Sequence, residues 1–271
     1  MSFFKKKNFL IAEAGINHNG KLKQALKLIN AAKSSGADAI KFQTYITEKR
    51  AKKNSPIFNI LKKCELNYKE FKILKDYCDA KKILFFSTPF DKEAVWFLDD
   101  IKVKLFKLAS FDISNYQLIS EVAKTKKPTI VSTGMANLNE IKKIHKFFKN
   151  KKVELAILHC ISSYPNKEEN SYLSNINFLK KKFKCEIGLS DHTNGIKIPI
   201  YANLLGARII EKHFKLSSNH KCVDSPVSID PSQFKKLKIE TLKIHKILNT
   251  YKFGIRKEER SAKQFKRKKI L

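Results

Sequence analysis

Short apolar runs alternate with longer amphipathic stretches along most of this chain of 271 residues. Eight runs have the length and composition of buried strands, at 9–14, 39–42, 84–88, 105–108, 129–132, 155–159, 186–189 and 208–211. Eight stretches have helical periodicity, at 21–35, 67–81, 91–100, 115–126, 137–149, 173–183, 196–205 and 231–250. Because no glycine-rich dinucleotide fingerprint follows the first run, the alternation predicts an α/β protein with a (β/α)8 TIM barrel rather than an open doubly wound sheet.

Several helix boundaries carry their own signals. Capping-box patterns begin at Asn67 and Ser114, and Asp230 is followed by a proline at the first helical position. Gly36 and Gly206 stand where helices are expected to end. These signals support the helical half of the alternation.

The chain is strongly basic, with 56 Lys and Arg against 25 Asp and Glu and a formal net charge of +31. Lysine is spread over nearly every predicted helix and accompanies much Phe, Ile and Asn, a combination that an AT-rich coding sequence would give. We therefore expect an electropositive surface that favours anionic substrates, and not nucleic acid as the main partner.

No run approaches the length of a membrane span and the first eight residues do not resemble a signal peptide, so we expect no membrane partner and a cytoplasmic location. The five cysteines are odd in number and form no CxxC pair, and we expect them to be reduced.

Polar or ionisable residues follow nearly every predicted strand. Catalytic groups of a TIM barrel lie at the carboxyl ends of its strands, so this is where we expect the site. The residues there are Glu13, Lys41, Gln43, Thr88, Lys107, Ser110, Asp112, Ser132, Thr133, His159, Ser162, Tyr164, Asp191, His192 and His213.

Two lysines at these ends, Lys41 and Lys107, would supply positive charge to a phosphorylated substrate. Hydroxyl groups of Thr88, Ser110 and Ser132 would add neutral hydrogen bonds. A Schiff-base role for either lysine is the alternative, because a desolvated strand lysine can activate a carbonyl in that way.

His192 and His213 follow consecutive strands of a predicted βαβ unit, so both imidazoles should emerge at the same edge of the sheet. Two imidazoles placed in this way can share one divalent metal. Such a metal keeps positions open for water and substrate and would act as a Lewis acid on a carbonyl. The alternative is that each histidine satisfies a hydrogen bond at a strand end.

Three carboxylates complete the candidate site, and a fourth, Asp191, directly precedes His192. Glu13 could orient a substrate or move a proton. Asp112 and Asp224 are predicted on loops, where recognition of a polyhydroxyl compound is the better interpretation. Asp191 could support a ligand histidine or form an Asx turn.

Eight ordered motifs resemble the sialic acid synthase family, which includes N-acetylneuraminate, legionaminate and pseudaminate synthases. They are AEAGINHNG, KFQT, FSTPFD, FKLAS, STGM, LHCISSYP, GLSDHTNG and EKHF, between about residues 9 and 231. The resemblance implies a barrel enzyme (EC 2.5.1) that condenses phosphoenolpyruvate with an N-acylated amino sugar. Such an enzyme uses a divalent metal, typically manganese with magnesium or cobalt as alternatives, and releases phosphate.

The same resemblance implies a role for each matching position. His192 and His213 would hold the metal, and Glu13 would lie close to the reacting centre. Phosphoenolpyruvate would be surrounded by Lys41, Thr88, Lys107, Ser110 and Ser132, whereas the sugar would face Gln43, Asp112, Ser162, Tyr164 and Asp224.

The chain also departs from the family pattern. The sequence ASFDI resembles the ASFEI form of pseudaminate synthases, but His159 is common in the other branches, so the acceptor could be N-acetylmannosamine or a 2,4-diacetamido-6-deoxy hexose. The loop before Asp224 lacks the usual Gly-Pro. We expect residues 1–250 to form the barrel and 251–271 a basic linker or tail, without the family's C-terminal antifreeze-like domain. A homodimer is compatible with this, and a barrel that has lost turnover and binds anionic sugar phosphates or polyanions is the second hypothesis.

Overall fold

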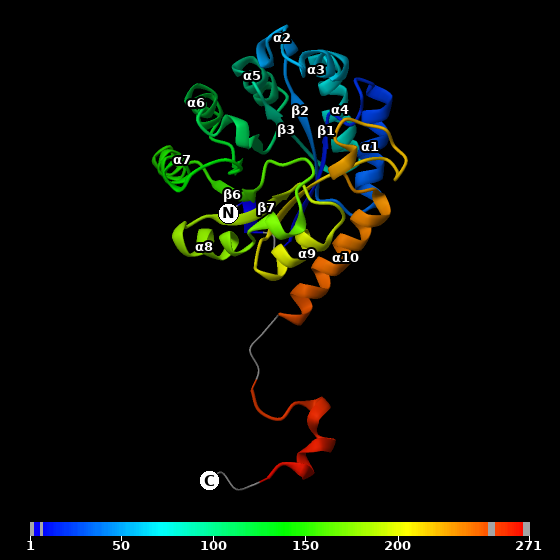
Figure 1. Cartoon of the computed structure of the whole chain (residues 1–271), viewed down its shortest axis with the longest axis vertical. Helices are drawn as coiled ribbons and strands as arrows, with labels where there is room; N and C mark the ends of the chain where they lie inside the picture. The colour runs from blue at the N-terminus through cyan, green and yellow to red at the C-terminus, as the bar shows by residue number, and fades with distance from the viewer. Residues whose placement is uncertain (1–2, 6–7, 249–252, 268–271) are drawn as a thin grey trace.

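The computed structural model describes residues 3–5, 8–248 and 253–267. Eight parallel strands pair in chain order and close into a barrel, with β1 paired to both β2 and β8 (Figure 1). The strands are β1 (Phe9–Gly15), β2 (Ala39–Thr44), β3 (Leu84–Pro89), β4 (Phe106–Leu108), β5 (Thr129–Ser132), β6 (Leu155–Cys160), β7 (Glu186–Asp191) and β8 (Ile209–His213). The predicted (β/α)8 barrel is confirmed.

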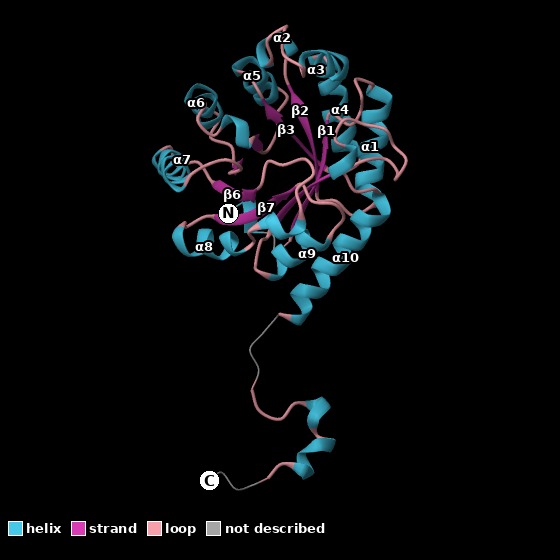
Figure 2. Ribbon diagram, viewed as in Figure 1, coloured by secondary structure: helices cyan, strands magenta, loops and turns pink. Residues whose placement is uncertain are grey.

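Helices surround the barrel and cover the outer face of its strands (Figure 2). They are α1 (Leu22–Ser34), α2 (Thr47–Arg50), α3 (Phe58–Cys64), α4 (Tyr68–Ala80), α5 (Lys92–Asp100), α6 (Tyr116–Lys124), α7 (Leu138–Asn150), α8 (Ser174–Lys182), α9 (Lys197–Leu204) and α10 (Pro231–Ile247). All eight predicted helices are present, but α2 and α3 were not predicted. They have four and seven residues, too few for a helical period to stand out from the lysine-rich segment that contains them.

The inward-facing row of the barrel changes character along the strands. Near their amino ends, Ile11, Ala39, Leu105, Ile130 and Ile209 join one buried apolar cluster inside the barrel. Two positions further along the same strands, and therefore on the same face, stand Glu13, Lys41, Lys107, Ser132 and Glu211. The lower barrel is thus a packed apolar plug, and the upper barrel is a polar chamber.

A larger apolar cluster fills the layer between strands and helices. Leu10, Phe42 and Phe85 point outward from their strands into this cluster and are at most 1% exposed. Apart from the partly exposed Gln43, Leu84 and Glu186, the strand residues are buried, as those of parallel strands usually are.

The helix boundary signals hold with one exception. Capping boxes form at Asn67 and Asp230, and Gly36 and Gly206 follow helix ends with φ of +83° and +92°. The capping box expected at Ser114 was wrong, because Asn115 caps α6 by accepting a hydrogen bond from the backbone N of Leu118.

The predicted boundary between barrel and tail, at residues 250 and 251, and the predicted last residues of α10 lie outside the described residues. Residues 253–267 are exposed and form two short 3-10 helices, drawn in red in Figure 1. Among the residues that the structure describes, no helix combines the length and apolar content needed to cross a lipid bilayer.

Candidate active site

A pocket opens at the carboxyl ends of the strands, above the apolar plug. Ten of the thirteen predicted site residues line it: Glu13, Lys41, Gln43, Thr88, Lys107, Ser110, Ser132, Tyr164, His192 and His213. They come from all eight strands or from the loops that directly follow them. The predicted clustering at one barrel mouth is therefore present.

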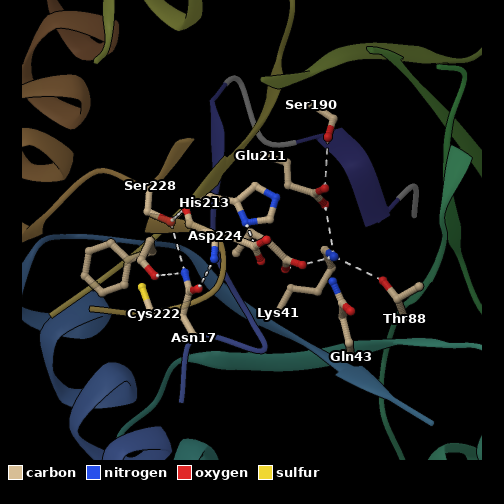
Figure 3. A network of polar contacts seen from close by, with 12 residues as sticks. Asn17, Lys41, Gln43, Thr88, Ser190, Glu211, His213, Cys222, Asp224 and Ser228 are labelled. Atoms are coloured by element: carbon tan, nitrogen blue, oxygen red, sulfur yellow. Dashed lines mark hydrogen bonds and ion pairs between the residues drawn. The ribbon is translucent and has the colours of Figure 1, made fainter. Parts of the chain in front are cut away.

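Lys41 lies at the centre of the polar contacts in the pocket (Figure 3). Its Nζ is 2.8 Å from Glu13 Oε2 and 3.8 Å from Glu211 Oε2, and it donates a hydrogen bond to Thr88 Oγ1 at 3.0 Å. Lys107 Nζ lies 3.3 Å from the other oxygen of Glu211. All four charged side chains are less than 7% exposed, so the two lysines and two glutamates form one buried network.

The network sets the protonation of its members. Burial lowers the pKa of a lysine, but Glu13 and Glu211 overcome this and raise the pKa of Lys41, which holds it as an ammonium ion. Burial also raises the pKa of Glu13 despite the opposing charge of Lys41. Glu211 has a pKa of about 2, because Lys107 and Lys41 outweigh the effect of its burial. Of the two carboxyl groups, Glu13 is therefore the one suited to take up a proton.

Ser132 and Ser110 line the same pocket as this network. The Oγ of Ser132 is buried and has no hydrogen-bond partner among the described residues. Ser110 Oγ accepts a hydrogen bond from the backbone N of Gly134 at 2.9 Å. A buried hydroxyl without a partner is costly, and a bound ligand would satisfy it.

His192 and His213 lie side by side at the ends of the neighbouring strands β7 and β8, with ring centroids 5.4 Å apart. The ring of Tyr164 packs against both, at 4.0 and 5.9 Å. His192 Nδ1 lies 2.7 Å from the carbonyl oxygen of Ile161, which can only accept, so Nδ1 carries a proton and the neutral tautomer of this ring has its lone pair on Nε2. His213 Nδ1 lies 3.4 Å from Asp224 Oδ2. Burial opposes protonation of His213, but Asp224 and Glu13 raise its pKa.

This arrangement fits a two-histidine metal site. A ligand histidine usually donates its other ring N–H to a carbonyl or carboxylate. His192 has such a partner in the carbonyl oxygen of Ile161, whereas Asp224 stands 3.4 Å from His213 Nδ1 as an ion-pair partner only. The described residues contain no group of three or more His, Cys, Asp or Glu side chains that could hold a metal. A metal held by the two histidines, with its remaining positions open to water and substrate, stays a prediction.

Three predicted residues do not line the pocket but stand beside it. Asp224 contacts His213, as described above. Ser162 packs against Gly134 so closely that a Cβ there would lie 2.2 Å from its Oγ. Asp112 accepts a hydrogen bond from Asn115 Nδ2 at 3.1 Å, and burial raises its pKa. Their proposed contacts with a sugar stay predictions.

Two residues at the strand ends have structural partners instead. His159 was expected at the mouth, but it faces outward from β6, where its Nε2 lies 2.7 Å from the carbonyl oxygen of Ser171. Asp191 accepts hydrogen bonds from the backbone N and the hydroxyl of Thr193, which is the Asx-turn alternative, and it also pairs with Lys212.

The sequence pattern of the NeuB family matches residues 28–252. This chain belongs to the NeuB family. It is 38% identical to the N,N'-diacetyllegionaminic acid synthase of Campylobacter jejuni over 96% of this chain and 82% of that protein. It is 40% identical to a pseudaminic acid synthase of the same organism, over 86% and 72%. The resemblance read from the motifs is confirmed, and the chain is an enzyme of the sialic acid synthase type.

Solved structures agree with this assignment. The N-acetylneuraminic acid synthetase of Leptospira borgpetersenii, crystallised with citrate, superposes on this NeuB-family chain with a TM-score of 0.91 at 41% identity, over 95% of this chain and 90% of that one. A truncated 3-deoxy-D-arabino-heptulosonate 7-phosphate synthase from Thermotoga maritima reaches a TM-score of 0.69 at 15% identity, which shows a shared fold alone.

Seven further residues line the pocket of this family member that the sequence analysis did not assign to it. Three are apolar, namely Phe90, Ala109 and Phe111, and the other four are Arg50, Cys160, Ser190 and Glu211. Strand alternation could have found Glu211, because it stands two residues before His213 on the same face. The same alternation could have placed Cys160 and Ser190 in the pocket, because both stand near the carboxyl ends of their strands, β6 and β7. Arg50 gave no signal, because it belongs to the short unpredicted helix α2.

Proposed function

We propose that this protein catalyses the metal-dependent condensation of phosphoenolpyruvate with an N-acylated amino sugar to give a nonulosonic acid, with release of phosphate. The observation that carries the proposal is a single pocket in which two facing histidines adjoin a buried lysine–glutamate network. Relatives named as legionaminic and pseudaminic acid synthases support the same class of product.

Phosphoenolpyruvate would bind over the lysine network. Lys41 is held as a cation, and the partnerless hydroxyl of Ser132 is available to an oxygen of the ligand. Thr88 hydrogen-bonds to Lys41 and so orients the ammonium group toward the pocket. Charged donors of this kind make the stronger hydrogen bonds to carboxylate and phosphate oxygens.

The acceptor sugar would bind on the histidine side, with its open-chain aldehyde toward His192 and His213. A divalent metal bound there would polarise the aldehyde oxygen as a Lewis acid. The ring of Tyr164, which packs on both histidines, would cover one face of the sugar and limit the access of water.

The proposed reaction forms one carbon–carbon bond. Carbon 3 of phosphoenolpyruvate attacks carbon 1 of the aldehyde, and water adds to carbon 2. The tetrahedral intermediate then loses phosphate by cleavage of the carbon–oxygen bond, which leaves the 2-keto acid. Glu13, with its raised pKa and its position 2.8 Å from Lys41, is the group we assign to proton transfer in these steps.

The Schiff-base alternative has less support from the site. A nucleophilic lysine must be a neutral amine, whereas Lys41 is held as an ammonium ion by two carboxylates. Burial does lower the pKa of Lys107, but Glu211 stands 3.3 Å from its Nζ. Treatment with borohydride in the presence of substrate would trap such an intermediate, and we expect no trapped adduct.

Identity to the relatives does not select the acceptor, because the chain is 38% identical to a legionaminic and 40% to a pseudaminic acid synthase. We keep both N-acetylmannosamine and the 2,4-diacetamido-6-deoxy hexoses as candidate acceptors. Manganese as the metal, a homodimer and a cytoplasmic location likewise stay predictions.

Phosphate release from phosphoenolpyruvate in the presence of manganese tests the proposal. Each candidate sugar is compared with a reaction that lacks sugar, and each reaction is repeated with a chelator. We expect release that depends on one class of sugar and stops with the chelator. No release with any sugar, from folded protein loaded with manganese, would instead favour a barrel that binds anions without turnover.

A further inference from the structure

Arg50 enters the candidate active site from α2. Its Nη1 donates a hydrogen bond to Gln43 Oε1 at 2.9 Å. The guanidinium carbon lies 3.6 Å from the ring centroid of Phe90 and 4.6 Å from that of Tyr45. Two aromatic rings and an amide therefore hold the guanidinium group in one position at the pocket wall.

No carboxylate of the described residues lies within 4 Å of the Arg50 guanidinium group. Asp112, Asp224 and Glu13 act on it only from a greater distance. Burial lowers the pKa of Arg50, yet arginine stays charged at neutral pH. A largely buried cation with several unused N–H donors calls for an anionic partner, because an unpaired buried charge is costly.

The charges within the lysine–glutamate network cancel one another. Lys41 and Lys107 face Glu13 and Glu211, so the four side chains are neutral when both glutamates are ionised. Protonation of Glu13 would leave them with one positive charge. Phosphoenolpyruvate carries about 2.5 to 3 negative charges near neutral pH, counting one for the carboxylate and the rest for the phosphate. The lysine network alone does not balance this charge.

We propose that Arg50 is a substrate-binding residue that pairs with a negatively charged oxygen of phosphoenolpyruvate and supplies the positive charge that the lysine network lacks. The inference rests on the proposed function. The planar guanidinium can donate two parallel hydrogen bonds to a carboxylate or a phosphate, and its stacking on Phe90 fixes the plane in which they point.

Equilibrium binding of phosphoenolpyruvate, measured by calorimetry with manganese and without sugar, tests this role apart from turnover. The variants are Arg50→Gln, which removes the charge, and Arg50→Lys, which keeps the charge and loses the planar fork. Lys49→Gln is the matched control, because the neighbouring Lys49 points to the surface and pairs with Glu93. Melting temperatures within a few degrees of the wild type show that each variant is folded.

We expect Arg50→Gln to weaken binding of phosphoenolpyruvate about 10- to 100-fold, in line with the loss of a charged hydrogen bond. Arg50→Lys should fall between this variant and the wild type, and Lys49→Gln should stay within twofold. Inorganic phosphate as a second titrant separates the two anionic groups. If Arg50→Gln weakens phosphate as well, the pairing is with the phosphate; if phosphoenolpyruvate alone is weakened, it is with the carboxylate.

Unchanged affinity for phosphoenolpyruvate in folded Arg50→Gln would overturn the inference and leave the proposed function standing. A raised KM for the sugar, together with unchanged binding of phosphoenolpyruvate, would also overturn it. Wild-type protein that binds no phosphoenolpyruvate at all would contradict the proposed function itself.

Discussion

Asp191 and Lys212 form a buried ion pair, with Lys212 Nζ 2.6 Å from Asp191 Oδ2 and side chains that are at most 3% exposed. The two residues directly precede His192 and His213, and they are register partners of β7 and β8. Lys212 also donates a hydrogen bond to the carbonyl oxygen of Thr193. The pair thus ties together the two strand ends that carry the candidate metal ligands.

Replacing Lys212 with methionine should destabilise the protein strongly, because it leaves Asp191 buried without its cation. Loss of one partner of a buried pair costs about 3–5 kcal/mol. Urea denaturation of the two proteins measures the difference in free energy of unfolding. Lys243→Met is the matched control, because Lys243 pairs with Glu240 at 2.9 Å on the surface and should contribute less than about 1 kcal/mol. Equal effects of the two substitutions would contradict this role of the buried pair.

Loss of either facing histidine should weaken metal binding in the pocket. In the proposed site, His192→Ala and His213→Ala each remove one of the two histidine ligands, and we expect the affinity for manganese to fall at least about tenfold. Titration followed by electron paramagnetic resonance measures free manganese directly and does not depend on turnover. His145→Ala on α7, far from the pocket in sequence and fold, is the control and should bind as the wild type does. Retained affinity in both pocket variants would place the metal elsewhere.

The fold could be predicted from the sequence because a parallel barrel leaves two local patterns in it, the apolar runs of its buried strands and the helical periodicity of its amphipathic helices. The helical face of α7 and the continuous apolar run of β6 are local patterns that a reader of the sequence can see. The helix α2 left no such pattern, so Arg50 could not be placed in the pocket. A short helix takes its position from tertiary contacts, here the stacking of Arg50 on Phe90.

The candidate site was predictable as far as strand ends determine it. Lys41, His192 and His213 follow from the rule that the carboxyl ends of barrel strands meet. The prediction for His159 was wrong because that rule does not say whether a side chain points into or out of the barrel. Cys160 lines the pocket, and successive side chains of a strand alternate between its two faces, so His159 points out of the barrel. The partners of Glu211 depend on distances between strands, which no local pattern contains.

Glu13→Gln should lower kcat of the proposed reaction about 10²- to 10⁴-fold, the usual contribution of a proton-transfer group. Glutamine keeps the shape of the side chain and a contact to Lys41 but cannot take up a proton. Phosphate release gives kcat, and calorimetry checks that phosphoenolpyruvate still binds. Glu93→Gln, which breaks a surface pair with Lys49, should leave kcat unchanged. A Glu13→Gln enzyme with nearly full kcat would remove Glu13 from the chemistry.

Stability should fall in mild acid through His18, which is 1% exposed. Its Nδ1 accepts a hydrogen bond from the backbone N of Gly20, so the folded protein holds the ring neutral, and burial lowers the pKa of His18 to about 4. In the unfolded chain the same ring has a pKa of about 6.5, so as the pH falls from 6.5 toward 4 the unfolded state takes up a proton that the folded state refuses. The loss attributable to His18 approaches about 3 kcal/mol at pH 4.

Comparison with His18→Asn isolates this contribution from the carboxylates that titrate in the same range. The free energy of unfolding of both proteins is measured by urea denaturation at pH 7 and at pH 4.5. Whatever the difference between them at pH 7, the wild type should lose more stability than the variant on going to pH 4.5, because the variant has no imidazole to protonate in its unfolded state. Parallel losses in the two proteins would show that His18 is protonated as readily when folded as when unfolded, against the burial seen here.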